Sequence, residues 1–274
     1  PWDIFISTNN TVYATSYLSG RAVVWNAGNS VPIRNIPGSW TNPQGLFVTT
    51  TDDIYISIYA SSNRIDKWTW NSTSSTSIMY TCDPCYDLFV DHADNLYCSM
   101  MTAYQVVRKS LHSSPDALTI IAGTGISGST SDTLNFPRGI FVDTDLDLYV
   151  ADYNNHRVQL FRSGQLNAIT VAGNTSINVT IALYYPTGIV LDADGYLFIV
   201  DRSNHRVVGS GPNGFRCVVG CSVGGGSAAN QLNGPLSVAF DSDGNMFVID
   251  NFNSRIQKFS LSTNSCSKCS RIGK

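Results

Sequence analysis

Charged side chains are scarce in this 274-residue sequence: Asp, Glu, Lys and Arg make up only 14%, against about 25% in average usage. The formal net charge is −3, so the sequence lacks the basic surface with which proteins bind nucleic acid or anionic lipid. It also lacks both the roughly 18 consecutive apolar residues of a membrane-spanning helix and a basic amino-terminal segment followed by an apolar run. These absences argue against nucleic-acid binding and membrane insertion.

Apolar residues, by contrast, are plentiful. Hydrophobic side chains make up 43% of the sequence and aromatic ones 11%, which is enough for a large buried core. A chain of this length has room for two domains, but all-β barrels and propellers of similar size often form one. Because the sequence begins at Pro1, we expect a processed product or a fragment.

Six of the seven cysteines fall into three close pairs. In the cytosol such pairs indicate zinc or redox chemistry, whereas in an oxidising compartment they indicate local disulfides. We predict disulfides within the pairs Cys82 and Cys85, Cys217 and Cys221, and Cys266 and Cys269. The seventh, Cys98, is interpreted as a small buried apolar residue, with an intermolecular disulfide as the alternative.

Four N-x-S/T sequons favour the oxidising compartment, because such sequons accept glycans in secreted proteins. They lie at Asn9, Asn71, Asn174 and Asn178. Sequons also arise by chance in chains rich in Asn, Ser and Thr. We nevertheless predict an extracellular, secreted glycoprotein.

A repeated unit accounts for the whole chain. Its best copy, PRGIFVDTDLDLYVADYNNHRVQLF, starts at Pro137 and recurs from Pro186 and Pro235, with weaker copies upstream. One anchor position, which follows a Pro-x pair in most copies, recurs every 42 to 52 residues. The anchors are Asp3, Gly45, Asp87, Gly139, Gly188 and Ser237. The chain therefore consists of six units.

Each unit reads as four short strands, because apolar runs alternate with Gly, Asn and Asp clusters and no helical period persists. Four strands in 42 to 52 residues is the period of a propeller blade. We predict an all-β fold, a single six-bladed β-propeller over residues 1–274 with four antiparallel strands per blade. The expected blades are 1–38, 39–83, 84–133, 134–182, 183–231 and 232–274.

The units also resemble NHL repeats, a family named for an Asn-His-Leu triplet. The shared features are the Pro-x-Gly-Ile start, the D-x-D-G turn, the LYVAD strand and a triplet that reads Asn155-His156-Arg157 and Asn204-His205-Arg206 here. The triplet degrades to Asn253-Ser254-Arg255 in the last unit. The resemblance covers all six units, is strong only in the last three, and implies a six-bladed propeller.

An Asp at the end of the second strand is followed five residues later by an Arg in the last three units. The pairs are Asp152 and Arg157, Asp201 and Arg206, and Asp250 and Arg255. These arginines could form an anion-binding ring, but binding sites usually break the symmetry of a repeat. We therefore interpret the pairs as structural, with each Asp fixing its own loop or pairing with its Arg.

Acidic clusters lie between the first and second strands, at Asp143/Asp145/Asp147, Asp192/Asp194 and Asp241/Asp243. They resemble the start of a calcium loop but lack the Glu at its twelfth position. We interpret them as tight hairpin turns. The sequence predicts no cofactor, with calcium as the alternative.

An enzyme has to be considered, because one NHL-like propeller is a zinc lyase with histidines facing its channel. The four histidines here are His92, His112, His156 and His205. Their positions place no three of them on innermost strands of different blades, where a catalytic zinc would need converging ligands. We predict that the chain is not an enzyme, with a metal-dependent lyase or hydrolase at the channel mouth as the alternative.

The remaining prediction is a binding or structural assembly module for a protein or glycan partner. The long inter-blade connections at 124–137 and 222–235 are the expected contact loops. The last unit ends on NSCSKCSRIGK, a poor outer strand. We therefore also expect an open sheet edge there, which extra chain or a second protomer would cover, giving a homo-oligomer or polymer.

Overall fold

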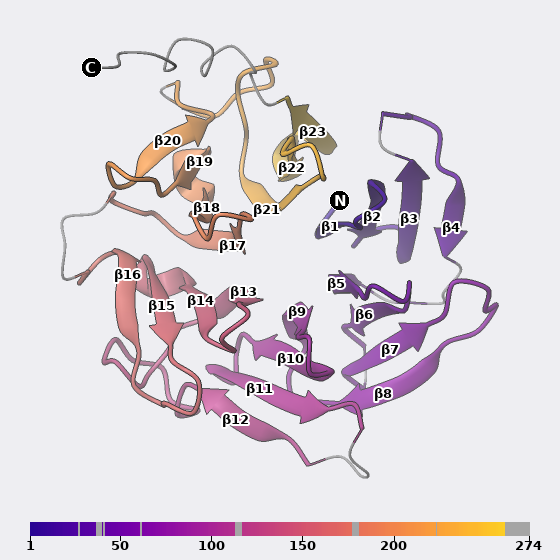
Figure 1. Ribbon diagram of the computed structural model, residues 1–274, viewed down its shortest axis with the longest axis horizontal. Helices are drawn as coiled ribbons and strands as arrows, with labels where there is room; N and C mark the ends of the chain where they lie inside the picture. The colour runs from indigo at the N-terminus through magenta and orange to yellow at the C-terminus, as the bar shows by residue number, and fades with distance from the viewer. Residues whose placement is uncertain are drawn as a thin grey trace, which may run out of the picture.

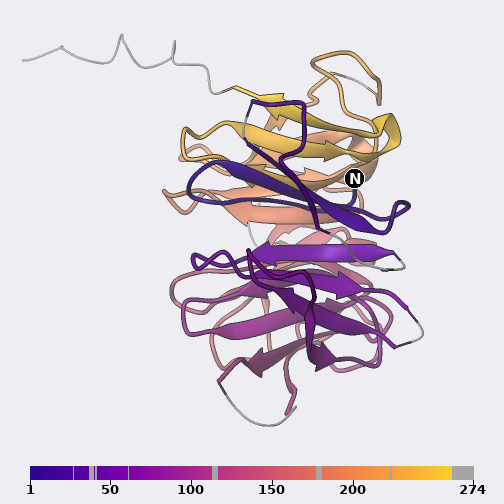
Figure 2. The ribbon, with the colours of Figure 1, turned by 90° about the vertical axis from the view of Figure 1, so that its right-hand side faces the viewer.

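The computed structural model describes residues 1–26, 28–36, 40, 42–60, 62–112, 117–176, 181–222 and 224–260. Six small antiparallel sheets surround a central axis as blades (Figure 1). Viewed from the side, the blades form a thick disc (Figure 2). The predicted all-β, six-bladed propeller is confirmed.

The first three blades each have four strands, ordered from the axis outward along the chain. Blade 1 consists of β1 (Ile4–Ile6), β2 (Thr11–Ser16), β3 (Arg21–Asn26) and β4 (Arg34–Ile36). Blade 2 consists of β5 (Pro43–Val48), β6 (Ile54–Ile58), β7 (Arg64–Trp68) and β8 (Thr76–Tyr80). Blade 3 consists of β9 (Cys85–Val90), β10 (Asn95–Met100), β11 (Gln105–Ser110) and β12 (Thr119–Ala122).

Blades 4 to 6 also contain one short 3₁₀ helix each, between the second and third strands. Blade 4 consists of β13 (Pro137–Val142), β14 (Leu148–Asp152), η1 (Tyr153–Asn155), β15 (Arg157–Phe161) and β16 (Ile169–Gly173). Blade 5 consists of β17 (Pro186–Leu191), β18 (Leu197–Asp201), η2 (Arg202–Asn204), β19 (Arg206–Gly209) and β20 (Arg216–Val219). Blade 6 consists of β21 (Pro235–Phe240), β22 (Met246–Asp250), η3 (Asn251–Asn253) and β23 (Arg255–Phe259).

Blade 6 has three strands within the described residues, and β23 pairs there only with β22. The four-strand prediction thus holds for five blades. The segment 261–274, which contains the expected poor outer strand, lies outside the described residues. In the part of the chain that is described, no helix is long and apolar enough to cross a membrane.

The core consists of six apolar clusters, each of which fills the space between two consecutive blades. The sixth closes the ring, since Phe247 and Ile249 of blade 6 pack with Ile4 and Val12 of blade 1. Each sheet is therefore buried on both faces, which explains why the strands are almost continuously apolar.

The acidic clusters form hairpin turns, as predicted. The Asp143 carboxylate accepts hydrogen bonds from the backbone N–H groups of Asp145 and Asp147, both at 3.0 Å. Asp192 and Asp241 accept equivalent bonds in the next two blades. One residue in each turn has a positive φ, for example Gly195 at 78°, which glycine adopts without steric cost.

One predicted disulfide is wrong. Cys85 is bonded to Cys98, and Cys82 is an exposed free thiol. In the antiparallel pair of β9 and β10, Cys85 lies opposite Met100 and Cys98 lies opposite Leu88, with a register shift between them. The Cα atoms of the two cysteines are 5.2 Å apart across this strand pair, so Cys98 is a disulfide partner rather than a lone apolar residue.

The Cys217–Cys221 disulfide is present as predicted. The third predicted pair, Cys266 and Cys269, lies outside the described residues.

Candidate binding face

The disc has two different faces. The first-to-second and third-to-fourth strand hairpins lie on one, called here the turn face. The second-to-third strand loops and the inter-blade connections lie on the other, called here the mouth face. The expected contact loops at 124–137 and 222–235 belong to the mouth face.

The repeated Asp–Arg pairs hold these loops in place. Arg157 donates from Nε to Asp152 at 2.8 Å, and its Nη atoms donate to the carbonyl oxygens of Ser129, Thr130 and Thr133. The side chain of Arg157 is 3% exposed and that of Asp152 is fully buried.

Blade 6 repeats this pattern with Arg255, which donates to Asp250 and to the carbonyl oxygens of Ser227, Ala228 and Gln231. In blade 5, Arg206 donates to Asp201 and to the carbonyl oxygen of Ala182. The structural interpretation of the three pairs is confirmed, because these arginines donate their hydrogen bonds to groups of their own chain.

The triplet histidines are structural as well. His156 and His205 have a left-handed backbone conformation, and their Nδ1 atoms accept hydrogen bonds from the backbone N–H groups of Tyr185 and Gly234. Burial lowers the pKa of the His156 imidazole. His112 pairs with Asp94 in an exposed turn. No group of three His, Cys, Asp or Glu side chains converges as a metal site among the described residues.

The anchor positions form a tight ring around the axis. A Cβ on Gly139 would lie 2.1 Å from the carbonyl oxygen of Thr187, so only glycine fits there. The Asp3 carboxylate accepts hydrogen bonds from the N–H of Leu46 in blade 2 and the hydroxyl of Ser237 in blade 6. It therefore links three blades at the point where the ring closes.

Asp87 makes a similar link, accepting a hydrogen bond of 2.8 Å from the N–H of Ile140 in blade 4. Burial raises the pKa of the Asp3 carboxyl to about 6 against the opposing effect of its hydrogen bonds. Burial, and after it the negative charge of Asp3, raise the pKa of Asp87 well above its usual range.

The central channel is a cavity of about 1010 Å³ that runs from this ring to the turn face. Four phenylalanines of successive inner strands contact one another around it, with ring centroids 4.9 to 5.1 Å apart. They are Phe5, Phe47, Phe89 and Phe141. Blades 5 and 6 have the smaller Val190 and Ala239 at this register, so the lumen is asymmetric and largely apolar.

On the mouth face, aromatic rings and two arginines form a continuous network around the axis. We call it the mouth surface, and it consists of Trp2, Tyr17, Tyr86, Arg138, Tyr153, Arg202 and Phe252. The indole of Trp2 stacks on Tyr17 at 4.8 Å and contacts Tyr86 at 5.7 Å. The network starts in blade 1 and reaches blade 6.

The two arginines connect the rings. The Arg138 guanidinium lies 3.6 Å from the centroid of the Tyr153 ring and donates a hydrogen bond of 3.2 Å to the Tyr86 hydroxyl. Arg202 donates to the Tyr153 hydroxyl at 3.3 Å and lies 5.3 Å from the centroid of the Phe252 ring. Both arginines are half-buried, whereas Phe252 is 60% exposed.

Neither arginine has an acidic partner within 4 Å in the described part of the chain. A guanidinium has five N–H donors, and within the described residues each of these two gives a single hydrogen bond, to a tyrosine. Three buried nitrogens of the mouth surface have no acceptor among the described residues: Arg138 Nε, Arg202 Nε and Trp2 Nε1. Burial raises the pKa of the Tyr86 hydroxyl, and the positive charges of Arg138 and Arg202 oppose that rise.

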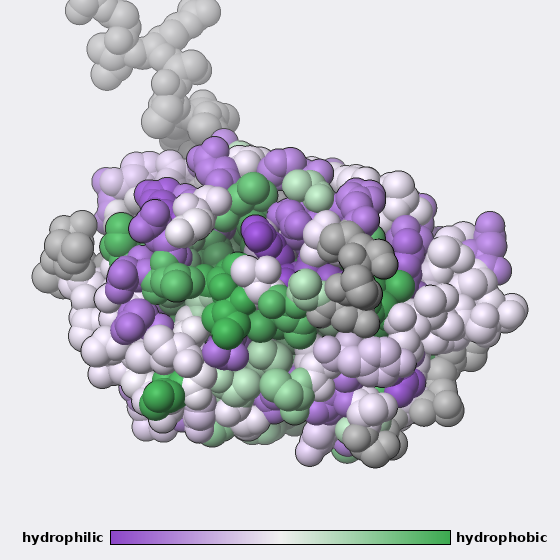
Figure 3. Space-filling model, turned by 90° about the horizontal axis from the view of Figure 1, so that it is seen from below, coloured by the Kyte–Doolittle hydropathy of each residue, from purple (hydrophilic) through white to green (hydrophobic). Residues whose placement is uncertain are grey.

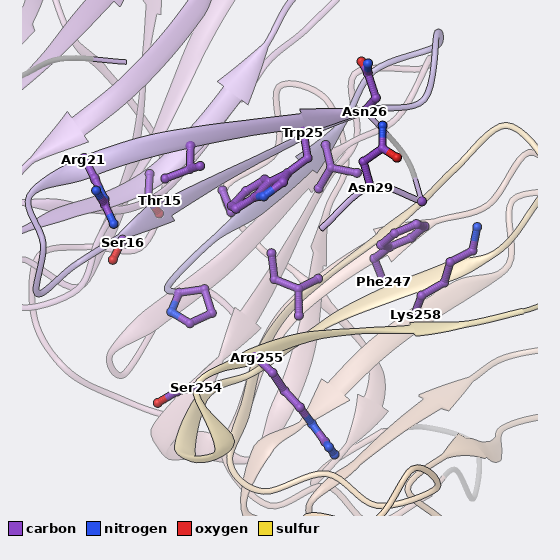
Figure 4. A pocket seen from close by; sticks show the side chains of 16 residues that line it. Thr15, Ser16, Arg21, Trp25, Asn26, Asn29, Phe247, Ser254, Arg255 and Lys258 are labelled. Carbon is purple, nitrogen blue, oxygen red and sulfur yellow. The ribbon is translucent and has the colours of Figure 1, made fainter. Parts of the chain in front are cut away.

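Two other surface features are weaker candidates. The first is the outer edge of the disc, called here the rim, which has apolar side chains in the middle of the view in Figure 3. Two exposed apolar residues of the rim are Ile120 in the outer strand β12 and Leu118 directly before that strand. A second cavity of about 460 Å³ lies between blades 1 and 6, where Trp25 and Phe247 line its walls (Figure 4). Its Arg255 points away from the cavity, toward the loop that it anchors.

The predicted glycosylation sites that are described are all exposed. Asn9 and Asn71 lie in hairpins of the turn face, and Asn174 follows β16 on the mouth face. Asn178 lies outside the described residues.

Sequence reasoning expected contacts at the long inter-blade loops and missed the mouth surface. One signal was available. The residue before each anchor is Trp2, Gln44, Tyr86, Arg138, Thr187 and Leu236. This register changes from blade to blade while its neighbours repeat, which is the asymmetry expected of a site.

Comparison with known proteins identifies the repeat. Residues 134–161 and 183–209 match the family model for the NHL repeat, and no curated protein matches the sequence of the chain. Among solved structures, a Bacteroides thetaiotaomicron protein of unknown function has a TM-score of 0.76 and 17% identity, over 95% of this chain and 69% of that one.

A chain of a nidogen/laminin complex has a TM-score of 0.70 and 16% identity, over 92% of this chain and 89% of that one. Virginiamycin B lyase of Staphylococcus aureus has a TM-score of 0.62 and 12% identity, over 96% and 84%. At these identities the likeness shows the fold alone. The chain is therefore a six-bladed β-propeller that carries NHL repeats in its fourth and fifth blades.

Proposed function

We propose that this propeller is an extracellular binding module that docks a protein partner through the mouth surface. The observation that carries the proposal is the half-exposed network of aromatic rings and two arginines, which have no acidic partner in the ranges that the structure describes. Trp, Tyr, Phe and Arg are enriched in the buried centres of protein interfaces and among the residues that contribute most binding energy.

The placement of the glycosylation sites supports this face. Two of the three described sequons, Asn9 and Asn71, lie on the turn face, so their sugars would leave the mouth surface accessible. The third, Asn174, lies on the mouth face but follows the outermost strand of its blade, β16. The two disulfides fit an oxidising, extracellular compartment. A chain of similar fold occurs in a nidogen/laminin complex, which is an assembly of proteins.

Photo-crosslinking tests the proposal. A photoreactive amino acid at position 252, in the mouth surface, should capture a protein from the extracellular medium in which this chain occurs. The same amino acid at Ile120 on the rim or at Asp145 on the turn face is the matched control, since both positions are exposed. The captured protein is then purified, and its affinity for the wild type is compared with its affinity for Arg138→Gln.

We expect Arg138→Gln to lower the affinity for the purified partner by about tenfold or more, because charge-assisted hydrogen bonds contribute about 1.5–3 kcal/mol. Capture from positions 120 and 145 but not 252 would contradict the proposal. A partner that binds Arg138→Gln as tightly as the wild type would contradict it too.

We propose further that the module is not an enzyme. The triplet histidines are engaged in loop contacts, and among the described residues no three His, Cys, Asp or Glu side chains are placed so that they could hold a metal ion. Metal analysis of the purified chain tests the alternative of a metal-dependent lyase or hydrolase. Stoichiometric zinc or calcium bound near the axis would reverse this preference.

A further inference from the structure

We infer that Arg138 and Arg202 form a binding site for one carboxylate group, supplied by an Asp or Glu side chain of the protein partner. The inference deepens the proposed function, because it takes the protein partner as the source of the carboxylate. The binding of a carboxylate by the two arginines is argued independently of that partner.

The two guanidinium groups are held close to one ring. Arg138 lies over the face of Tyr153 at 3.6 Å, and Arg202 donates to the hydroxyl of that same residue at 3.3 Å. Tyr153 thus positions both cations without neutralising either. A planar guanidinium offers a fork of donors that matches the two oxygens of a carboxylate.

A purely structural role explains these arginines poorly. The structural arginines of this chain show what such a role looks like: Arg157 reaches a carboxylate and three carbonyl oxygens. Arg138 reaches one tyrosine hydroxyl among the described residues, and its buried Nε has no acceptor there. Leaving a buried charged donor unpaired costs more than leaving a neutral one, so an anionic acceptor would stabilise this arrangement.

The nearby acidic groups do not supply that acceptor. Asp3 and Asp87 belong to the ring beneath the mouth surface, where backbone N–H groups and Ser237 already occupy their oxygens. Neither forms an ion pair with Arg138 or Arg202.

The aromatic surroundings favour a side chain of a protein over a free anion. Trp2, Tyr86 and Phe252 flank the two cations, and they offer apolar contact area to whatever carries the carboxylate. They also exclude water, which strengthens the charge pairing.

The test is a titration of the isolated propeller with glutarate, a probe for the Glu side chain, followed through the Nε–H signals of its arginines by NMR. We expect saturable shifts of the Arg138 and Arg202 signals. Arg138→Gln and Arg202→Gln should each weaken binding about tenfold or more, since each removes a charge-assisted pair. Arg162→Gln is the matched control, because Arg162 pairs with Asp147 on the turn face.

Inorganic phosphate and neutral glutaramide complete the design. Stronger binding of phosphate than of glutarate would overturn the assignment of a carboxylate site. Binding of glutaramide as tight as that of glutarate would show that the site does not recognise negative charge, and would overturn the assignment too. Equal weakening by Arg162→Gln would overturn the location. Unfolding midpoints of the variants, if unchanged, show that each loss is local.

The two proposals fail differently. If position 252 captures a partner that needs Arg138 but glutarate does not bind, the protein-binding function stands and the carboxylate site does not. If glutarate binds as expected but position 252 captures no protein, the carboxylate site stands and the proposed function does not.

Discussion

Two sets of arginines on the same face of the propeller differ in almost every physical respect. Arg157, Arg206 and Arg255 occupy one repeated position, and each pairs with a fully buried aspartate. Arg138 and Arg202 occupy positions that other blades fill with other residue types, and neither has an acidic partner among the described residues. The first set stabilises loops, whereas the second leaves positive charge available at the axis.

The difference shows how a repeat protein separates stability from function. Every blade must solve the same packing problem, so residues that solve it recur at the same register. A ligand on the axis meets six blades at once and needs different groups from each. Departures from the repeat are therefore where binding should be sought.

The largest expected effect comes from breaking the repeated set. Arg157→Ala leaves the buried Asp152 carboxylate without its cation and frees three carbonyl oxygens of the loop at 124–137. Removing one partner of a buried ion pair costs about 3–5 kcal/mol. Denaturant unfolding should show a loss of that size. A loss below about 1 kcal/mol would mean that the pair does not hold the fold.

A somewhat smaller effect is expected at the Cys85–Cys98 disulfide. Cys85 directly precedes Tyr86 of the mouth surface, so this bond ties one ring of the network to β10. Replacing both cysteines with Ala should lower the free energy of unfolding by about 2–4 kcal/mol. It should also weaken glutarate binding, measured by the same titration. The double replacement of Cys217 and Cys221, in a different blade, should leave glutarate binding unchanged.

The ring below the mouth should give a pH-dependent effect. The folded chain keeps a proton on Asp3 up to a pKa of about 6, whereas the unfolded chain loses it near its usual value of about 4. The stability from this group is thus complete below about pH 4 and is lost as the pH rises through about 6.

The variant Asp3→Asn removes this titration. The stability difference between wild type and variant should therefore change by on the order of 3 kcal/mol across that window. Urea unfolding at a series of pH values measures it, with the exposed Asp145→Asn as the control. A difference that does not vary with pH would show that the Asp3 carboxyl is ionised in the fold at all these pH values.

The smallest expected effect on stability comes from the arginines of the mouth surface, Arg138 and Arg202. Arg138→Gln breaks one hydrogen bond, to the Tyr86 hydroxyl, and relieves an unpaired charge. These changes oppose one another, so the free energy of unfolding should change by less than about 1 kcal/mol. A loss as large as that of Arg157→Ala would erase the distinction between the two sets.

The fold could be predicted from the sequence because its determinants repeat. Six copies of one strand pattern showed the blades, and the Asp–Arg spacing correctly indicated a structural pair. Turn residues such as Asp143 were also interpreted correctly, because their chemistry is local in sequence.

What could not be predicted depends on contacts between distant residues. Cys85 is bonded to Cys98 of the neighbouring strand, 13 residues away, and no spacing rule for close cysteine pairs predicts such a partner. The mouth surface joins Trp2, Arg138 and Phe252 from three blades, and only closure of the ring brings them to one axis. Its signal in the sequence is that the residue before each anchor does not repeat from blade to blade. That signal becomes informative once the anchors have been aligned.

One measurement tests the separation of the two sets most directly: the shifts of all arginine Nε–H signals during a single glutarate titration. The account predicts saturable shifts for Arg138 and Arg202 with one common affinity, and no shifts for Arg157, Arg206 and Arg255. Equal shifts across all five, or shifts confined to the repeated set, would contradict it.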